Sequence, residues 1–450
     1  MSTMYDNELI FSGVEQAYQK LPRELYEKYD VQRGLRKNDG SGVMAGLTSI
    51  GDVKGYVFDD GEKIPCEGRL RYRGIDVSKI VSSCQKENRF GFEEVAYLLL
   101  TGNLPTEEQL EYFNECIAEH RSLPAGFAED MILKAPSADI MNKLARCVLV
   151  CYSYDENPDD VSLSNIFRQS VELIARMPVM VAYGYQAKAH YHDGKSLFLH
   201  APQKNLSTAE NFLYMIRPDN KYTQQEAEIL DLALILHAEH GGGNNSAFAT
   251  RVLSSSGTDT YSAIAAAVGA LKGPRHGGAN ARVMGMIEDF KANITDITDE
   301  KQIRDHIVKI LKCEAYDKSG LVYGMGHAIY TLSDPREKML KAKAKELAEN
   351  LGMMDEFMLY DTIERLTPEL FDEIRHNGKT MCANVDMYSG FVYKMLNIPP
   401  ELYTPLFAIA RIAGWCAHRI EEITVNKRII RPAYKSVVRG RDYVEMKDRA

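Results

Sequence analysis

The sequence predicts an all-α protein on the basis of three observations. Apolar residues recur at i, i+3 and i+4 spacing along most of the chain, which is the spacing of an amphipathic helix. Strand signals are scarce and lie before residue 73. Apolar residues make up 45% and charged residues 26% of the 450 positions, as in ordinary globular proteins. At roughly 100–200 residues per domain, this length fits two to four domains, or a large domain with a smaller one inserted.

The expected elements begin with a helical pattern over Val14–Tyr29, after which Gly40–Gly42 breaks the chain. Two short strand-like pieces follow, at residues 55–58 and 70–72, around a turn at residues 59–61. Helical spacing dominates from there on. The expected helices are Phe92–Leu100, Glu107–His120, Met141–Cys151, Ile166–Ala182, Gln224–His237, Tyr261–Leu271, Gly278–Phe290, Lys301–Ile310, Pro335–Asn350, Met354–Leu366, Val385–Met395 and Pro405–Arg419.

Composition argues against several classes of protein. The net charge of −9 does not favour a nucleic-acid binder. The absence of a run of eighteen apolar residues argues against a membrane protein. The eight cysteines include no C-x2-C pair, which in a chain of this length indicates reduced thiols and a cytoplasmic location. Asp6 and Glu8, with no apolar stretch around them, do not fit a secretory signal.

The first segment that could carry chemistry is residues 236–246. His237 and His240 lie three apart at the end of an apolar helix, so we expect them on one face, with Gly241–Gly243 ending the helix. One interpretation is a helix C-terminus whose histidines cap carbonyl groups. A zinc site is the alternative, but the zincin pattern needs two histidines four apart with a glutamate directly after the first, and this segment has neither.

The second segment, residues 273–280, places His276 near the start of a helix. The partial positive charge there favours a neutral imidazole, and free backbone N–H groups suit an anionic oxygen. A neutral imidazole in this position could donate a hydrogen bond to a developing enolate. The simpler interpretation, a loop histidine among turn residues, fits less well because Arg275 and Asn280 are polar too.

The third segment, Gly324-Met325-Gly326-His327, has the form of a ligand-binding loop. It lacks the lysine of a P-loop and the third glycine of a dinucleotide-binding turn. Downstream, Asp334 and Pro335 predict the N-cap and first residue of a helix. Arg336 in that first turn opposes the helix dipole, which argues against a purely structural role.

Three further features complete the inventory. Asp386 begins a helix, either as a simple N-cap or as a functional carboxylate. Arg411 lies in an apolar stretch and needs an anionic partner. Residues 427–441 hold six basic residues and no acidic residue, which suggests binding of polyanionic small molecules or simply a solvated tail. Histidines, a carboxylate and arginines together suit carbanion chemistry on a multiply charged carboxylate substrate.

These segments resemble those of the citrate synthase family in the same order and at similar spacing. The resemblance runs from Gly68–Gly74 to near Arg441 and covers most of the chain. It implies a citrate synthase-like all-α homodimer, in which residues 1–280 and 388–450 form a large domain and residues 281–387 a smaller inserted domain. It also implies condensation of acetyl-CoA with oxaloacetate, followed by thioester hydrolysis, with no metal and no other cofactor.

The resemblance assigns roles residue by residue. Asp386 would abstract a methyl proton from acetyl-CoA, His276 would stabilise the enol or enolate, and His327 would polarise the oxaloacetate carbonyl. Oxaloacetate would be bound by a further set: His240, Arg336, Arg411 and Arg431, the last from the other subunit, with His237 and Asn244. The loop Leu321, Val322, Tyr323, Gly324, Met325 and Gly326 would present its backbone to CoA.

Some positions depart from the family pattern. Gly241 stands where a glutamate is common, and Met325 where an aromatic residue is common. Thr331 stands in place of a common basic residue, and Tyr388 in place of a common histidine. Thr331 puts the contacts to the CoA phosphates in doubt. The alternative functions are 2-methylcitrate synthase, which uses propionyl-CoA, a metal-dependent hydrolase using His237, His240, His276 and Asp386, and a helical scaffold without catalysis. The substrates of citrate synthase and 2-methylcitrate synthase differ by one methylene in an apolar pocket, which is worth about 1–3 kcal/mol of binding free energy.

Overall fold

The computed structural model describes residues 21–37, 40–60, 62–376, 380–426 and 428–449, and it divides into two compact units. One unit is formed by the chain ends, Met1–Gly46 and Arg431–Ala450. Within its described residues, the expected N-terminal helix is represented by α2 (Arg23–Lys28), while residues 14–20 lie outside the described part. The C-terminal segment is extended and exposes large apolar side chains, Tyr434 at 95% and Tyr443 at 78%.

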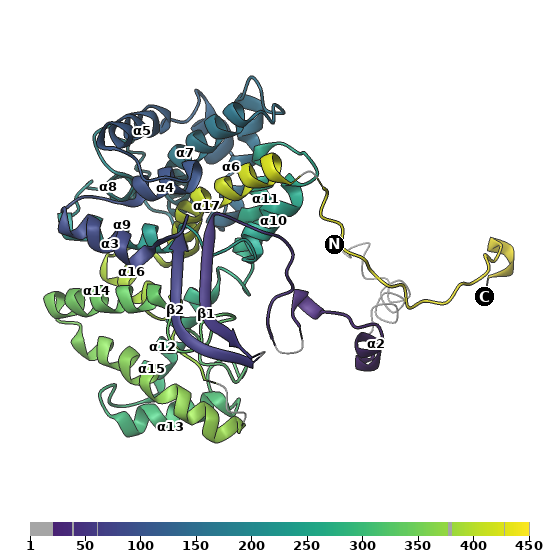
Figure 1. The fold of residues 1–450 in the computed structure, drawn as a ribbon. Helices are drawn as coiled ribbons and strands as arrows, with labels where there is room; N and C mark the ends of the chain where they lie inside the picture. Colours follow the sequence, from purple (N-terminus) through teal and green to yellow (C-terminus); the bar gives the residue numbers. More distant parts are fainter. Residues whose placement is uncertain (1–20, 38–39, 61, 377–379, 427, 450) are drawn as a thin grey trace. The chain divides into compact units, whose positions relative to one another are not determined.

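The other unit, Leu47–Ile430, is mostly helical, which confirms the predicted all-α class (Figure 1). Most expected helices are present with ends shifted by a few residues, but α7 and α15 continue well past their expected ends, and α3, α8 and α10 were not expected. The helices are α3 (Val77–Lys86), α4 (Phe92–Thr101), α5 (Glu107–His120), α6 (Ile140–Cys151), α7 (Leu163–Tyr191), α8 (Thr208–Ile216), α9 (Gln224–His237), α10 (Asn245–Ser254), α11 (Thr260–Lys272), α12 (Ala279–Asn293), α13 (Glu300–Leu311), α14 (Pro335–Leu351), α15 (Met354–Arg375), α16 (Asp386–Met395) and α17 (Tyr403–Val425).

Helix α17 forms the centre of this unit. It packs against α4, α7, α9, α10 and α11, and its residues 408–422 are buried throughout. A helix that is buried on all sides is normally apolar. This one carries Arg411, His418 and Arg419, each with 0% exposure. Each of these groups therefore needs a partner inside the protein or in a ligand.

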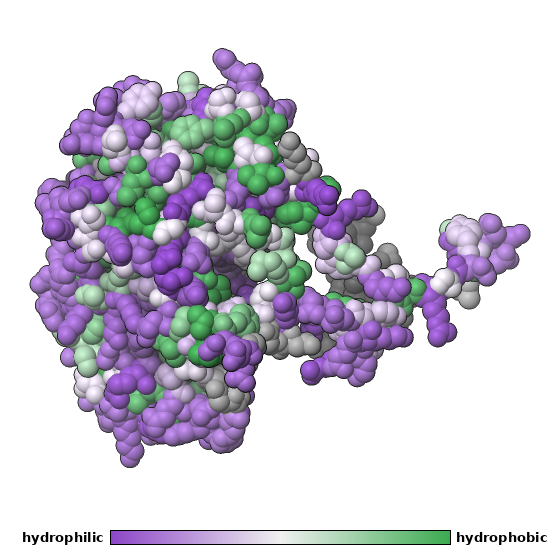
Figure 2. All heavy atoms as spheres, in the orientation of Figure 1, coloured by the Kyte–Doolittle hydropathy of each residue, from purple (hydrophilic) through white to green (hydrophobic). Residues whose placement is uncertain are grey.

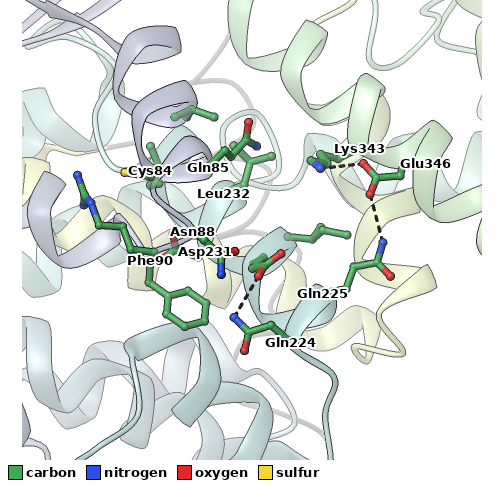
Figure 3. A pocket seen from close by; sticks show the side chains of 15 residues that line it. Cys84, Gln85, Asn88, Phe90, Gln224, Gln225, Asp231, Leu232, Lys343 and Glu346 are labelled. Atoms are coloured by element: carbon green, nitrogen blue, oxygen red, sulfur yellow. Dashed lines mark hydrogen bonds and ion pairs between the residues drawn. The ribbon is translucent and has the colours of Figure 1, made fainter.

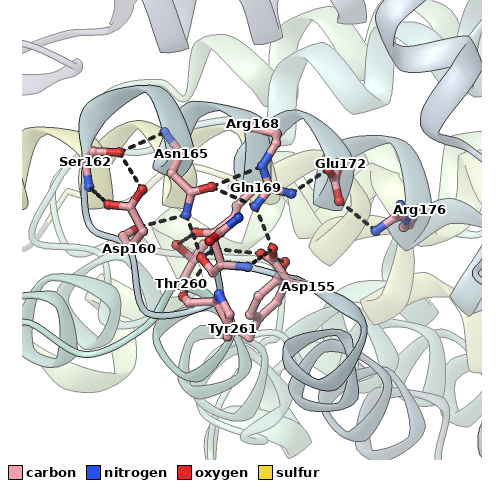
Figure 4. Close-up of polar contacts among 12 residues, drawn as sticks. Asp155, Asp160, Ser162, Asn165, Arg168, Gln169, Glu172, Arg176, Thr260 and Tyr261 are labelled. Atoms are coloured by element: carbon pink, nitrogen blue, oxygen red, sulfur yellow. Dashed lines mark hydrogen bonds and ion pairs between the residues drawn. The ribbon is translucent and has the colours of Figure 1, made fainter.

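Arg419 finds its partners in a polar network at the start of α7, and Figure 4 shows the part of it around Asp155, Gln169 and Thr260. Its Nε donates to the Thr260 hydroxyl at 2.9 Å, and Thr260 in turn hydrogen-bonds Gln169. Gln169 Nε2 and the Tyr261 hydroxyl both donate to the Asp155 carboxylate, at 2.8 and 2.7 Å. The network connects α7, α11 and α17 and satisfies this buried cation, because every group in it has a complementary neighbour.

A three-stranded antiparallel sheet precedes the helices: β1 (Gly51–Asp59), β2 (Glu62–Tyr72) and β3 (Ile75–Asp76). The first two strands are longer than the short pieces expected, and Gly51 pairs with Tyr72. Two glycines bring this hairpin against the loop before α14. A Cβ on Gly55 would lie 2.5 Å from the Ile329 carbonyl oxygen, and one on Gly68 would collide with that of Ser333. Only glycine permits so close an approach of two backbones.

The face of the molecule drawn in Figure 2 is largely hydrophilic, with apolar areas scattered over it. Within the described residues, no helix is long and apolar enough to cross a membrane. The expected boundaries of an inserted domain at residues 281 and 387 remain a prediction.

Candidate active site

The guanidinium of Arg411 is the most unusual group in the molecule. It is fully buried, and its Nε donates to the His237 carbonyl oxygen at 2.6 Å. Neither Nη1 nor Nη2 has a hydrogen-bond partner among the described residues. The Phe407 ring lies 4.8 Å from the guanidinium carbon, which offers a cation–π contact but no negative charge. Two such nitrogens on one guanidinium can donate to the two oxygens of a carboxylate.

His237 and His240 lie beside this cation. The prediction that both share a helix face is wrong, because α9 ends at His237 and His240 lies beyond it. The helix stops because other side chains take its last carbonyl groups: the Tyr72 hydroxyl binds that of Ile235 at 2.9 Å, and Arg411 binds that of His237. Long-range contacts therefore end the helix before the three glycines are reached.

Both histidines are held in the neutral form. Burial, followed by the charges of Arg336 and Arg411, lowers the pKa of His237 well below its ordinary value. The pKa of His240 is also lowered well below its ordinary value, first by burial and then by Arg336 and His327. Nδ1 of His237 and Nε2 of His240 are buried without a hydrogen-bond partner in the described structure. Each neutral ring can therefore offer a hydrogen bond to a ligand.

His327 comes from the loop before α14. Its ring lies 5.1 Å from that of His240 and stacks on Tyr330 at 4.7 Å between centroids. The backbone N–H groups of Ile329 and Tyr330 donate to its Nδ1, at 3.1 and 3.2 Å. Since Nδ1 accepts, the proton of the neutral ring is on Nε2, which becomes the donor.

Arg336 is anchored by its own helix cap. Asp334 caps α14, as expected, and its two carboxylate oxygens accept from Nε and Nη2 of Arg336 at 3.0 and 2.7 Å. This bidentate contact fixes the guanidinium plane, and both residues are buried. The neighbouring Tyr330 ring, 5.7 Å from the guanidinium carbon, packs against it. Asp334 and Tyr330 were not among the expected site residues.

His276 lies in the turn before α12, as the sequence predicted, and its Nε2 is 3.1 Å from the Ser246 hydroxyl. Burial, with a contribution from Arg411, lowers the pKa of His276 to about 4, so the ring is neutral at pH 7. Ser246 also accepts from Trp415 Nε1 at 3.0 Å and lies 2.9 Å from Asn244 Oδ1. The Ser246 hydroxyl donates its one proton to Asn244 Oδ1, so the His276 nitrogen that faces it, Nε2, is a donor. Asn244 itself is the N-cap of α10.

Asp386 is the first residue of α16, not its cap. The Asn384 side chain accepts from the Asp386 N–H at 3.0 Å, so the carboxylate of Asp386 is not needed for capping. Burial raises the pKa of Asp386 to about 6, although Arg336 acts in the opposite direction. A carboxylate with this pKa is a better base than an exposed aspartate and is still ionised at neutral pH.

The loop 321–326 is joined to the segment before Asp386. Gly326 N donates to the Cys382 carbonyl, Asn384 N to the Gly324 carbonyl and Asn384 Nδ2 to the Gly326 carbonyl, each at 2.8 Å. Gly324 and Gly326 have φ values of 82° and 83°, which only glycine adopts at little cost. Leu321 is 54% exposed, Val322 is buried, and Tyr323 and Met325 are half-buried.

Arg431 belongs to the unit formed by the chain ends and is exposed. The structure therefore brings together Arg411, Arg336, the histidines and Asp386, while the role of Arg431 remains a prediction.

A metal site does not form in the described part of the chain. No three His, Cys, Asp or Glu side chains there converge closely enough to hold an ion, and this includes the four residues of the hydrolase alternative. A cavity of about 210 Å³ between α3, α9 and α14 also lies apart from the site (Figure 3). It is lined by amides such as Gln224 and Gln225 and contains none of the histidines.

Comparison with known proteins identifies the family. A family model described as the citrate synthase C-terminal domain matches residues 39–433. The chain belongs to the citrate synthase family. A citrate synthase of Haloferax volcanii is 36% identical over 379 residues, covering 83% of this chain and 90% of that protein. A 2-methylcitrate synthase of Corynebacterium glutamicum is 33% identical over 413 residues, covering 90% and 96%.

Solved citrate synthase structures share the fold. The enzyme of Thermoplasma acidophilum, solved in a ternary complex with carboxymethyl coenzyme A and oxaloacetate, superposes with a TM-score of 0.74 at 26% identity, covering 93% of this chain and 99% of that one. The enzyme of Pyrobaculum aerophilum gives 0.74 at 29% identity, covering 91% and 94%.

The raised pKa of Asp386 leads to a pH prediction. If this carboxylate is the base, protonating it stops the reaction, so kcat/KM for acetyl-CoA should fall below about pH 6 at saturating oxaloacetate. The measurement is a pH–rate profile with circular dichroism at each pH as a control for folding. A midpoint of 4 or below in folded protein would contradict the assignment.

Proposed function

We propose that this protein is a citrate synthase that condenses acetyl-CoA with oxaloacetate and hydrolyses the resulting thioester to citrate and CoA. The observation that carries the proposal is the buried guanidinium of Arg411, with two unpartnered nitrogens, amid neutral histidines in a chain of this family. A carboxylate of a dianionic substrate would accept hydrogen bonds from these two nitrogens.

Oxaloacetate would bind first through its carboxylates. Arg411 would take one carboxylate with Nη1 and Nη2, and Arg336, held by Asp334, would take part of the other. Neutral His240 and His237 would add hydrogen bonds. Asn244 would add another when its side chain turns from the start of α10, which it caps, toward the substrate. His327 Nε2–H would donate to the ketone oxygen and draw electrons from the ketone carbon.

Carbon–carbon bond formation would follow from the opposite polarity of the two substrates. Asp386 would remove a proton from the acetyl methyl group, and the His276 ring would hydrogen-bond the thioester oxygen as the enol forms. The enol carbon would bond to the ketone carbon, and the ketone oxygen would take the proton of His327. Water would then cleave the thioester and release CoA. No metal or other cofactor enters this scheme.

CoA itself would lie along the loop 321–326, whose positive-φ glycines turn backbone groups outward. Thr331 does not supply a phosphate contact here, because its hydroxyl donates to the Gly55 carbonyl at 3.2 Å.

The main alternative is 2-methylcitrate synthase, since one relative carries that name. The test is release of the CoA thiol in the presence of oxaloacetate, with acetyl-CoA and propionyl-CoA compared. We expect a higher kcat/KM for acetyl-CoA, by about tenfold for a pocket that excludes one methylene. Preference for propionyl-CoA would favour the alternative, and no thiol release with either donor would contradict both.

We also propose that the enzyme acts as a homodimer in the cytoplasm. Free thiols at all eight cysteines agree with a reducing compartment. The exposed apolar side chains of the C-terminal segment need a partner surface, and Arg431 lies in that segment. Arg431 would reach the active site of the other subunit, so that each site depends on both chains.

Mixed dimers test this sharing. Arg431→Ala and His276→Ala should each be inactive alone. In a heterodimer, one site keeps both His276 and the Arg431 of the other chain, so activity should return to about a quarter to a half of that of the unmodified dimer. Absence of activity in purified heterodimers would show that Arg431 serves its own subunit.

A further inference from the structure

A second charged group lies deep in the site beside Arg411. Glu239 stands between His237 and His240 and has 0% exposure. Its Oε1 accepts from His418 Nε2 at 2.9 Å and from the Gly241 N–H at 2.5 Å. Its Oε2 has no hydrogen-bond partner among the described residues. A carboxylate buried this deeply is costly unless other charges compensate it.

The hydrogen-bond pattern around His418 shows that Glu239 is the acceptor. His418 Nδ1 lies 2.7 Å from Arg251 Nη2, and a guanidinium can only donate. His418 therefore accepts at Nδ1 and donates from Nε2 to Glu239. The charge of Arg251 is already matched by Glu421 and by Glu422, the latter at 2.9 Å. Arg251 thus orients His418 but leaves the charge of Glu239 to be balanced elsewhere.

Two glycines allow the Glu239 carboxylate to occupy its place. A Cβ on Gly51 of β1 would lie 2.7 Å from Oε1, and one on Gly414 of α17 would collide with Oε2. Gly414 lies one helical turn after Arg411, so the carboxylate is packed against the helix segment that carries the guanidinium. Arg411 also holds the His237 carbonyl, two residues before Glu239.

The two charges act on one another without a hydrogen bond between them. Burial lowers the pKa of Arg411 to about 10, and Glu239 is the group that most strongly opposes this fall, ahead of Tyr72. Burial alone would raise the pKa of Glu239, but His418 and Arg411 together bring it below the ordinary value. Both groups are therefore charged at pH 7.

We propose that Glu239 is the resident counter-ion of Arg411: it balances the buried guanidinium in the empty site and leaves Nη1 and Nη2 available for a substrate carboxylate. This makes Glu239 a positioning residue, and the inference rests on the proposed binding of oxaloacetate. When oxaloacetate arrives, its carboxylate takes over the compensation and is repelled by Glu239. Glu239 therefore stabilises the empty enzyme and weakens the binding of substrate.

The test is Glu239→Gln, which keeps the acceptor for His418 and Gly241 but removes the charge. The empty variant should unfold at a Tm lower by about 2 °C or more, since Arg411 loses its counter-ion. Calorimetric titration at pH 7 should give an oxaloacetate Kd at least about fivefold tighter than that of the unmodified protein, because the repulsion is gone. A residue needed only for structure would weaken binding instead.

Glu93→Gln is the matched control, because Glu93 is also buried and its carboxylate accepts a backbone N–H, that of Thr208 at 2.7 Å. It should leave the oxaloacetate Kd unchanged. Unchanged or weaker binding in Glu239→Gln would overturn the inference, and so would tighter binding with no loss of Tm. If the unmodified protein binds no oxaloacetate, the proposed function fails, and the Tm comparison still tests the pairing of Glu239 with Arg411.

Discussion

The positive charge of Arg411, buried in the core of α17, is the constraint on which the rest of the site depends. An ion in an apolar interior costs several kcal/mol unless its surroundings compensate it. Here the compensation comes from the His237 carbonyl, the Phe407 ring and the charge of Glu239, and two nitrogens remain open. The same charge helps to keep His237, His240 and His276 neutral, so the rings can serve as hydrogen-bond donors.

Close backbone packing places the other groups around this charge. Glycines at positions 55 and 68 let the β1–β2 hairpin lie directly on the loop that carries His327 and precedes Arg336. At its other end, the hairpin contacts the end of α9 through Tyr72. One hairpin therefore contacts both segments whose histidine rings meet at 5.1 Å. Any side chain at Gly55 or Gly68 would displace the loop by a distance that matters for chemistry.

Much of the fold could be predicted from the sequence, because local periodicity determines where helices lie. The helix at residues 107–120 was predicted to the residue, since its apolar spacing and its Thr106–Gln109 capping box are local. The helix Gln224–His237 was also predicted to the residue from its apolar spacing, but the expectation that Gly241–Gly243 end it was wrong, because α9 stops before them, where Tyr72 and Arg411 bind its last carbonyl groups. Helix α8 was missed although Ser207 and Glu210 form a capping box that signals its start.

The site likewise has features that the sequence predicts and features that only the folded structure shows. The need of Arg411 for an anion could be predicted from its apolar neighbours alone. The proton positions on His327 and His418 could not, because they depend on which groups meet each ring nitrogen. The contact between His418 and Glu239 joins residues 179 positions apart, and no local pattern indicates it. Asp334 could have been recognised as a partner of Arg336, since a cap two residues away is within reach of the side chain.

Calorimetric titration of oxaloacetate into Arg411→Ala and Asp386→Asn tests the central claim most directly. Each variant removes one charge from the same site, but only Arg411 is assigned to bind a carboxylate. The account predicts that Arg411→Ala loses affinity by about 100-fold or more, the worth of two charge-assisted hydrogen bonds, while Asp386→Asn stays within a few-fold of the unmodified protein. Equal losses in the two folded variants would contradict it.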